Sequence, residues 1–266
     1  SSMDFCYFDY ESSDSRVDFG QVLEFSFVHT DKNLKILNQK ELKCRIKPNV
    51  VPSIGAMLVN NISPQMLTNA PLSHYELVME NYHWFQKLSP IYFTGFNIAA
   101  FDIEFYRRML FKNLIPNWYQ TNTNGNKIHD VLPQVRAAKF INRNAIATKL
   151  NDKGNDSFKL QDLSEVGNFN HGISHSSIVD CLNTIEVSKK IKQVGISSNV
   201  DLKKHNLNYK IRDHSLAKIP LLLICGKKEV DSNSVTIRRL DSNKQENMDL
   251  NLFLKTFSAL NKASSN

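Results

Sequence analysis

Two carboxylates one residue apart, Asp9 and Glu11, end an apolar stretch near the start of the chain, FCYFDYESS at residues 5–13. Alternate side chains of a β-strand point to the same face, so a buried strand would direct both carboxylates to one side. Neighbouring carboxylates repel each other, and a divalent cation with oxygen ligands is the simplest partner that keeps both ionised. Taken alone, such a pair is more often a solvated turn, so the rest of the chain decides its meaning.

An apolar stripe further along the chain predicts a helix that carries a third carboxylate. The helix would begin after Asn97, with this residue as its cap, and would hold Asp102 in its second turn. Its apolar face consists of Ile98, Phe101, Phe105 and Met109. Asp102 adjoins that face, which indicates a place at the edge of the core. A surface Asp on an amphipathic helix is the alternative.

A histidine and a fourth carboxylate lie at the start of the next long helix, which is predicted from residue 178. His175 and Asp180 are five residues apart, a spacing that leaves them about 140° from a common helical face. We therefore expect His175 at the helix entrance, where Ser174 or Ser176 can cap, and Asp180 one turn in on the side that faces the site.

Other segments predict the elements around these residues. Residues 22–28 and 34–46 are typical of strands, which with the opening strand predict an antiparallel meander. A short buried strand is expected at 91–94. Helix starts are predicted at 63–64, at Ser73 with Glu76 completing a capping box, and at 129–130, the last continuing to 140. A short helix is expected at 160–166.

Composition bounds the class and the compartment. No apolar run among the 266 residues approaches a membrane span, and no apolar signal-peptide core opens the chain, so no membrane contact is expected. The four cysteines form no CxxC pair and predict free thiols in the reducing cytoplasm: Cys6, Cys44, Cys181 and Cys225. Cys181 could instead bind zinc together with His171 and His175. This alternative is disfavoured because the spacing of the three residues fits no common zinc finger.

The positive charge is concentrated near the end of the chain. Residues 191–266 carry 13 Lys and Arg against seven Asp and Glu, whereas the whole chain has a net charge of +7. A basic segment on a near-neutral body indicates a polyanion partner. A solubilising surface is the alternative.

Three motifs in this order resemble the DEDDh (DnaQ-like) 3′→5′ exonuclease superfamily. They are Asp9-x-Glu11, Asn97-x4-Asp102 and His175-x4-Asp180. Residues 1–190 are most similar to the catalytic domain of the bacterial exonuclease I family. The likeness is carried by FDYES, by NNISPQML at 60–67, by GFNIAAFDIEFYRRMLF at 95–111 and by HSSIVD at 175–180.

The resemblance implies an α/β fold of the ribonuclease H type, a mixed sheet flanked by helices. It implies two Mg²⁺ or Mn²⁺ ions about 4 Å apart, which activate water and stabilise the leaving oxygen, with His175 as the base. The metal ligands would be Asp9, Glu11, Asp102 and Asp180. Substrate contacts would come from Ser12, Val59, Asn60, Asn97 and Phe101. Family members often carry Thr where Ser12 stands and His or Thr where Asn60 stands, and plain core is the alternative for Phe101.

Residues of about 194–262 resemble part of the anticodon-binding domain of threonyl-tRNA synthetase. The segments VDLKKHNLNYKIRDHSLAKIPLLLICGKKEV at 200–230 and VTIRRL at 235–240 carry this likeness. A small incomplete α/β module is expected over 191–266, with helices at about 207–218 and 250–260, strands at 221–224 and 235–240, and a turn at Gly226. Arg238 matches that family, whereas Lys204 stands where the family usually has Asn. The module is expected to bind RNA, or to pack on the body or on another chain.

Together these features predict a metal-dependent 3′→5′ exonuclease that hydrolyses single-stranded DNA and releases nucleoside 5′-monophosphates, with a place in DNA repair. RNA is the alternative substrate, in an exoribonuclease that trims tRNA or small RNA. The alternative of another class is a nucleic-acid-binding protein with a silent site. The presence of all five catalytic residues argues against it.

Overall fold

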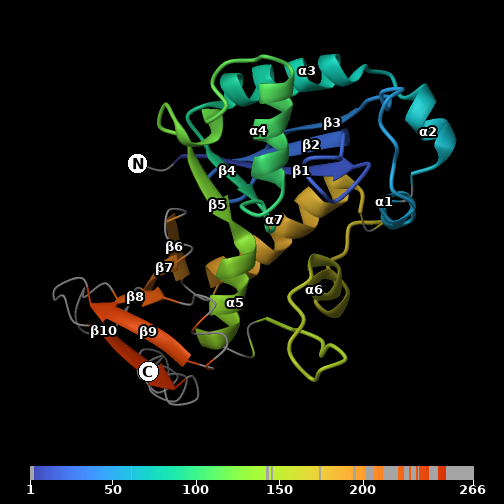
Figure 1. Cartoon of the computed structure of the whole chain (residues 1–266). Coiled ribbons are helices and arrows are strands. Elements are labelled where there is room, and N and C mark those ends of the chain that lie inside the picture. Colours follow the sequence, from blue (N-terminus) through green and yellow to red (C-terminus); the bar gives the residue numbers. More distant parts are fainter. Residues whose placement is uncertain are drawn as a thin grey trace. The chain divides into compact units, whose positions relative to one another are not determined.

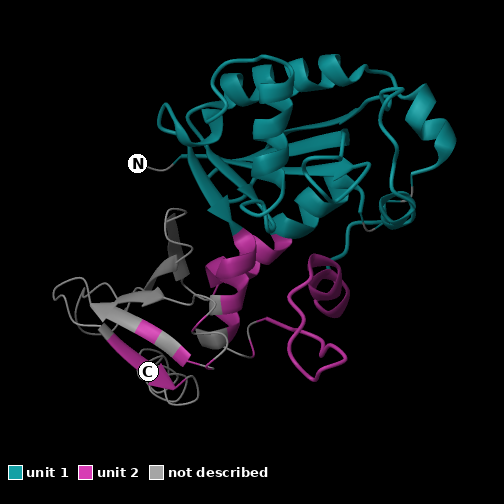
Figure 2. Ribbon diagram, in the orientation of Figure 1, with its two compact units in different colours: residues 1–130, 169–185 teal, residues 131–168, 186–266 magenta. Residues whose placement is uncertain are grey.

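The computed structural model describes residues 3–60, 62–141, 144, 146–173, 175–193, 196–201, 206–211, 221–224, 228, 232, 234–239 and 245–249. The chain divides into two compact units, residues 1–130 with 169–185 and residues 131–168 with 186–266 (Figure 2). No helix in the described ranges is long and apolar enough to cross a membrane. Cys6, Cys44 and Cys181 are buried free thiols, and Cys225 lies outside the described residues.

A five-stranded mixed sheet forms the centre of the first unit (Figure 1). In the order β3-β2-β1-β4-β5, the first two pairings are antiparallel and the other two parallel. The antiparallel part confirms the predicted meander. The strands are β1 (Phe5–Ser12), β2 (Val22–Thr30), β3 (Ile36–Lys43), β4 (Tyr92–Gly95) and β5 (Lys127–Asp130).

The pairing of β1 with β4 is short. It covers only Phe5–Tyr7, whereas β2 follows β1 to its end. The chain turns away at Gly95, where a Cβ atom would lie 2.2 Å from Cγ2 of Ile98 and 2.9 Å from the carbonyl oxygen of Phe8. Glycine is required here by this close approach. The second half of β1, which carries both predicted carboxylates, is therefore open on the β4 side.

Helices cover both faces of this sheet, with α3 and α4 on one side and the first half of α7 on the other (Figure 1). Ser63 caps α2 ahead of Pro64, and Ser73 forms a capping box with Glu76 at the start of α3, so both predicted helix starts are confirmed. The helical elements are α1 (Ile54–Val59), α2 (Pro64–Asn69), α3 (His74–Leu88), α4 (Asp102–Lys112), the 3₁₀ turn η1 (Gln120–Asn122) and α7 (Ser177–Gln193).

Aromatic side chains fill the space between the sheet and α3. The ring centroid of Phe85 lies 4.5 Å from that of Phe93 and 5.3 Å from that of Phe8, and all three side chains are buried. Because neighbours alternate along a strand, burying Phe8 on this face directs Asp9 and Glu11 to the opposite face.

The second unit contains the second half of α7 and an antiparallel sheet of order β10-β9-β8-β7-β6. The predicted helix at 160–166 and the predicted strands at 221–224 and about 235–240 are confirmed. The elements are α5 (Val131–Ile141), α6 (Leu160–Val166), β6 (Ile196–Asp201), β7 (Asn206–Ile211), β8 (Leu221–Ile224), β9 (Ser234–Arg239) and β10 (Gln245–Asp249).

Two predicted helix starts in the first 140 residues are wrong. The helix expected from Asn97 begins at Asp102. Asn97 has a left-handed φ of 59°, which a helix cap does not adopt. The pair 129–130 is strand rather than helix, because His129 and Asp130 continue the parallel pairing of β5 with β4 before α5 begins.

The basic segment also differs from prediction. The helix expected at 207–218 is strand β7 over its described part, and Leu207, Tyr209 and Ile211 show the period of two that a strand requires. The helix predicted at 250–260 and the turn at Gly226 lie outside the described residues.

Candidate active site

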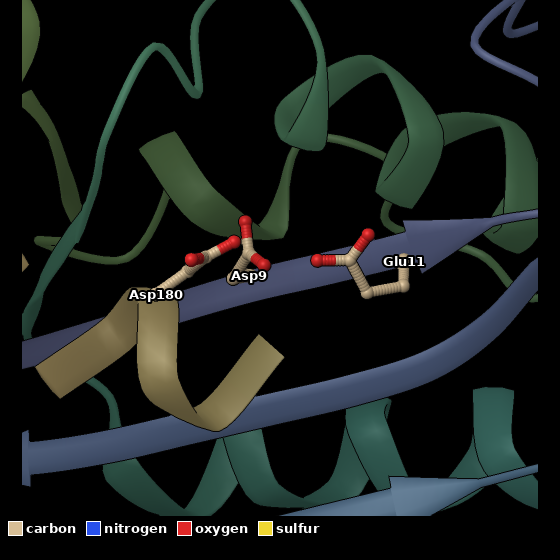
Figure 3. A group of neighbouring side chains, drawn as sticks. All are labelled: Asp9, Glu11 and Asp180. Carbon is tan, nitrogen blue, oxygen red and sulfur yellow. The ribbon is translucent and has the colours of Figure 1, made fainter. Parts of the chain in front are cut away.

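Asp9 and Glu11 meet Asp180 on the face of the sheet that α7 covers. Oxygen atoms of the three side chains lie within 4.8 Å of one another. Figure 3 shows Asp9 and Glu11 rising from β1 and Asp180 reaching toward them from the first turn of α7. Glu11 is only 6% exposed. The strand period therefore placed this pair as predicted, and Asp180, which was also predicted as a metal ligand, lies beside it.

α7 is held on the sheet close to Asp180. The Cys181 thiol lies 3.7 Å from the carbonyl oxygens of Tyr7 and Ser26, on the two neighbouring strands β1 and β2. The N–H of Asp180 donates to the carbonyl of Ser176 at 2.9 Å, which closes the first turn. The backbone next to Asp180 is thus packed directly against the strand that carries Asp9.

Asp102 adjoins this group through the open edge of β1. It is the first residue of α4, is 6% exposed, and accepts the N–H of Tyr10 at 3.0 Å. That N–H has no strand partner because β4 has already turned away. The buried position excludes a surface Asp. Asp102 is not among the three carboxylates that lie within 4.8 Å, but its charge raises the pKa of Asp9.

Burial raises the pKa of all four carboxyl groups. In Asp9 desolvation is reinforced by the charges of Asp102 and Asp180, and in Glu11 by that of Asp180. Desolvation is also the largest cause of the raised pKa of Asp102 and of Asp180. Oδ2 of Asp9 is buried without a hydrogen-bond partner. Mutual repulsion and an unpaired buried oxygen fit a divalent cation that takes oxygen ligands.

His175 lies directly before α7, at the predicted helix entrance. Its φ of 62° is left-handed, and its side chain is half-buried, which lowers its pKa. Its backbone forms a hydrogen bond with the Asp180 carboxyl, lowering that pKa against the effect of burial. The imidazole is accordingly neutral near pH 7, the form that accepts a proton. Ser174, one predicted cap, lies outside the described residues.

Three of the predicted substrate residues are brought together beyond the end of β1. The side-chain amide of Asn60 donates to the carbonyl of Ser12 at 3.0 Å. Val59 precedes Asn60 at the end of α1 and is 51% exposed. Ser12 uses its hydroxyl to donate to the carbonyl of Asp14 at 2.7 Å. An exposed apolar side chain therefore stands next to polar groups at the edge of the carboxylate cluster.

Phe101 and Asn97 have different surroundings. Phe101 is 46% exposed directly before α4, so plain core is the wrong alternative for it. Asn97 is held by its backbone, because its N–H donates to Asp130 at 2.8 Å and the N–H of Ala99 donates to the same carboxylate at 3.1 Å. Its role toward substrate stays a prediction.

Two polar residues were missed by the sequence analysis. Asp130 holds the turn that leads into Asp102. Glu24 of β2 stands opposite Glu11 in the strand register and binds the first residue of α7. A lone carboxylate inside the apolar run VLEFSFV is the signal that could have found Glu24.

The zinc alternative is not supported. Within the described part of the chain, the one group of three or more candidate ligands is Asp9, Glu11 and Asp180. The Cys181 thiol is buried against the sheet instead.

Comparison with known proteins identifies the class. A family model described as Exonuclease matches residues 7–188, and a model of the anticodon binding domain matches residues 180–260. The chain belongs to the Exonuclease family, and both predicted resemblances are confirmed. It shares its fold with the exonuclease I of Methylocaldum szegediense, with a TM-score of 0.67 and 23% identity over 72% of this chain and 40% of that one. E. coli exonuclease I bound to a dT13 oligonucleotide gives a TM-score of 0.69 at 18% identity over 84% of this chain and 55% of that one.

Curated relatives resemble the two parts of the chain separately. Exodeoxyribonuclease I of Buchnera aphidicola subsp. Baizongia pistaciae is 27% identical over 194 residues, which are 73% of this chain and 40% of that protein. Threonine–tRNA ligase of Pelagibacter ubique is 85% identical over 81 residues, 30% of this chain and 13% of that protein. The chain thus spans less than half the length of these curated relatives.

Proposed function

We propose that this protein is a metal-dependent 3′→5′ exonuclease that hydrolyses single-stranded DNA and releases nucleoside 5′-monophosphates. The observation that carries the proposal is the group of Asp9, Glu11 and Asp180, in which one oxygen of Asp9 is buried without a partner, in a chain of the Exonuclease family. The chemistry of this carboxylate group favours phosphodiester hydrolysis. A polyanionic substrate approaches four carboxylates only when cations offset their charge, and bound cations also activate water for attack on a phosphodiester.

Each residue has a defined part in this proposal. Asp9, Glu11, Asp180 and Asp102 would hold two Mg²⁺ or Mn²⁺ ions, which supply charge stabilisation to the transition state and lower the pKa of water. The neutral ring of His175 accepts the proton of the attacking water. Phe101 and Val59 offer exposed apolar surface to the terminal bases, and Ser12 with Asn60 orients the terminal nucleotide.

The preference for DNA rests on relatives. The curated relatives that match about three quarters of the chain are exodeoxyribonucleases, and E. coli exonuclease I has been solved with dT13 and dA16 oligonucleotides. The organisation that we propose is an exonuclease domain at 1–190 and a basic module at 191–266. The ranges of the two family models support this division.

A second candidate is an exoribonuclease that trims tRNA or small RNA. The anticodon-binding match over 180–260 and the basic charge of the same segment favour it. In this version the module at 191–266 binds RNA and delivers a 3′ end to the carboxylates. A 2′-hydroxyl contact would distinguish the two substrates.

The test uses the full chain with 5′-labelled single-stranded DNA and RNA of equal sequence, in Mg²⁺, in Mn²⁺ and in EDTA. We expect a descending ladder of 5′-labelled DNA, released deoxynucleoside 5′-monophosphate, no cleavage of circular single-stranded DNA and no product in EDTA. Asp9→Asn should abolish the reaction. Asp18→Asn is the matched control, because Asp18 is exposed and paired with Arg108 at 3.0 Å.

The other outcomes overturn specific parts of the proposal. Cleavage of RNA alone selects the exoribonuclease. Cleavage of circular DNA contradicts exonuclease action. No cleavage in any metal, with retained binding of the oligonucleotide, identifies a silent nucleic-acid-binding protein.

A further inference from the structure

Glu24 ties the start of α7 to the sheet. One carboxylate oxygen of Glu24 accepts both the N–H of Ser177 at 3.0 Å and the hydroxyl of Ser177 at 2.5 Å. The Ser177 hydroxyl also lies 2.6 Å from that of Ser26. Both serines are completely buried. Three polar groups from β2 and α7 thus form one closed network, between residues about 150 positions apart in the chain.

Proton counting fixes the direction of this network. The Ser177 hydroxyl donates to Glu24 and so uses its single hydrogen there. It must then accept from Ser26, whose hydroxyl is the donor. Each of the three groups is satisfied, and a buried network of this kind holds a unique arrangement.

The network gives α7 a cap that comes from the sheet. The first N–H groups of a helix have no partner within it, and a side chain just before the helix usually supplies one. Here the left-handed φ of His175 redirects the chain before α7, and Glu24 on strand β2 accepts the N–H of the first helical residue. A carboxylate also suits the positive end of the helix dipole. The position of the helix start is therefore set by the sheet.

The two site residues on this segment are close to the tie. His175 stands two residues before Ser177, and Asp180 stands three residues after it. On the sheet side, Glu24 faces Glu11 directly across the β1–β2 pairing. The two hydrogen bonds from Ser177 to Glu24 therefore join the helix that carries Asp180 to the strand that pairs with Glu11.

We propose that Glu24, acting through Ser177, is a positioning residue that sets the place of Asp180 and His175 relative to Asp9 and Glu11. The inference rests on the proposed exonuclease function for its kinetic test and on the carboxylate cluster alone for its metal-binding test. Glu24 touches neither substrate nor reacting atoms in this assignment.

The kinetic test compares Glu24→Ala, Glu24→Gln and Ser177→Ala in the full chain. Displacement of a catalytic group by about 1 Å costs up to about 100-fold in rate, so Glu24→Ala should lower kcat by about 10- to 100-fold with little change in KM. Glu24→Gln keeps the accepting oxygen and should restore most of the rate. Glu24→Ala with Ser177→Ala should be no worse than Glu24→Ala alone, because both act through one contact.

Glu41→Gln is the matched control. Glu41 lies on β3, pairs with Lys43 at 3.2 Å and is more exposed than Glu24, so its loss should leave kcat unchanged. Wild-type kcat in folded Glu24→Ala, or a Glu24→Gln protein as slow as Glu24→Ala, overturns the positioning role. If Glu24→Ala does not fold, Ser177→Ala takes its place in the comparison with Glu24→Gln. Wild-type kcat in Ser177→Ala, or a Glu24→Gln protein as slow as Ser177→Ala, then overturns the positioning role.

The metal-binding test keeps this inference separate from the proposed function. Titration with Mn²⁺, followed by electron paramagnetic resonance without nucleic acid, should show weaker binding in Glu24→Ala than in Glu24→Gln, because the alanine variant releases Asp180. Equal Mn²⁺ affinity in the two variants overturns the inference. A wild-type protein that binds Mn²⁺ but cleaves no nucleic acid refutes the proposed function only.

Discussion

Asp9→Asn is expected to stabilise the metal-free protein while abolishing its activity. The charges of Asp102, Asp180 and Glu11 raise the pKa of Asp9 on top of its burial, and its Oδ2 has no partner. Asparagine keeps the shape of the side chain and removes the charge. Relief of a buried group left unsatisfied is worth about 1–3 kcal/mol, which in a chain of this size raises Tm by about 2–4 °C per kcal/mol.

The pH dependence of this effect follows from the same carboxyl groups. Their folded-state pKa values lie above the value of about 4 that they have in an unfolded chain. Their contribution to stability is therefore complete below about pH 4 and is lost as the pH rises through the raised values. In EDTA the wild-type protein should lose Tm relative to Asp9→Asn as the pH rises above about 4, because the folded-state pKa of Asp9 is raised.

Thermal melts followed by circular dichroism measure both effects, in EDTA and in excess Mn²⁺. The cation should raise the Tm of the wild type, since a ligand that binds only the folded state stabilises it, and should raise that of Asp9→Asn far less. Asp18→Asn is the control and should change stability by less than about 1 kcal/mol. An Asp9→Asn protein that melts below the wild type in EDTA at alkaline pH refutes the reasoning.

Four further substitutions test other parts of the site. His175→Ala and Asp102→Ala should each abolish turnover in the ladder assay, and wild-type rates in Asp102→Ala would remove this residue from the mechanism. Gly95→Ala should cost about 1–3 kcal/mol in urea denaturation, since its Cβ meets Ile98 and the backbone; an unchanged midpoint contradicts the close approach. Phe101→Ala should raise KM for oligonucleotide and leave Tm unchanged, because the side chain is half-exposed; a lowered Tm would indicate packing.

Local signals in the sequence predicted the elements that depend on nearby residues. The capping box of Ser73 and Glu76 lies within one helical turn, and the alternation around Asp9 lies within one strand. Both are short-range effects that a sequence displays directly. The placement of Asp9 and Glu11 on one face of the strand, with buried Phe8 and Tyr10 on the other, was predictable for the same reason.

Features that depend on distant partners were not predictable in this way. α4 begins at Asp102 rather than after Asn97 because Asp130, 33 residues away, takes the N–H of Asn97. His129 belongs to a strand because β4 pairs with it. Glu24 caps a helix 153 residues away. The distance between Asp102 and the other three carboxylates likewise depends on where β4 leaves the sheet.

The open edge of β1 has a consequence for the choice of an inactive variant. Asp102 accepts the N–H of Tyr10 at this edge, and both residues are buried. A buried donor that loses its acceptor costs about 1–3 kcal/mol. Asp102→Ala should therefore unfold at a lower temperature than Asp9→Asn, which leaves this hydrogen bond in place.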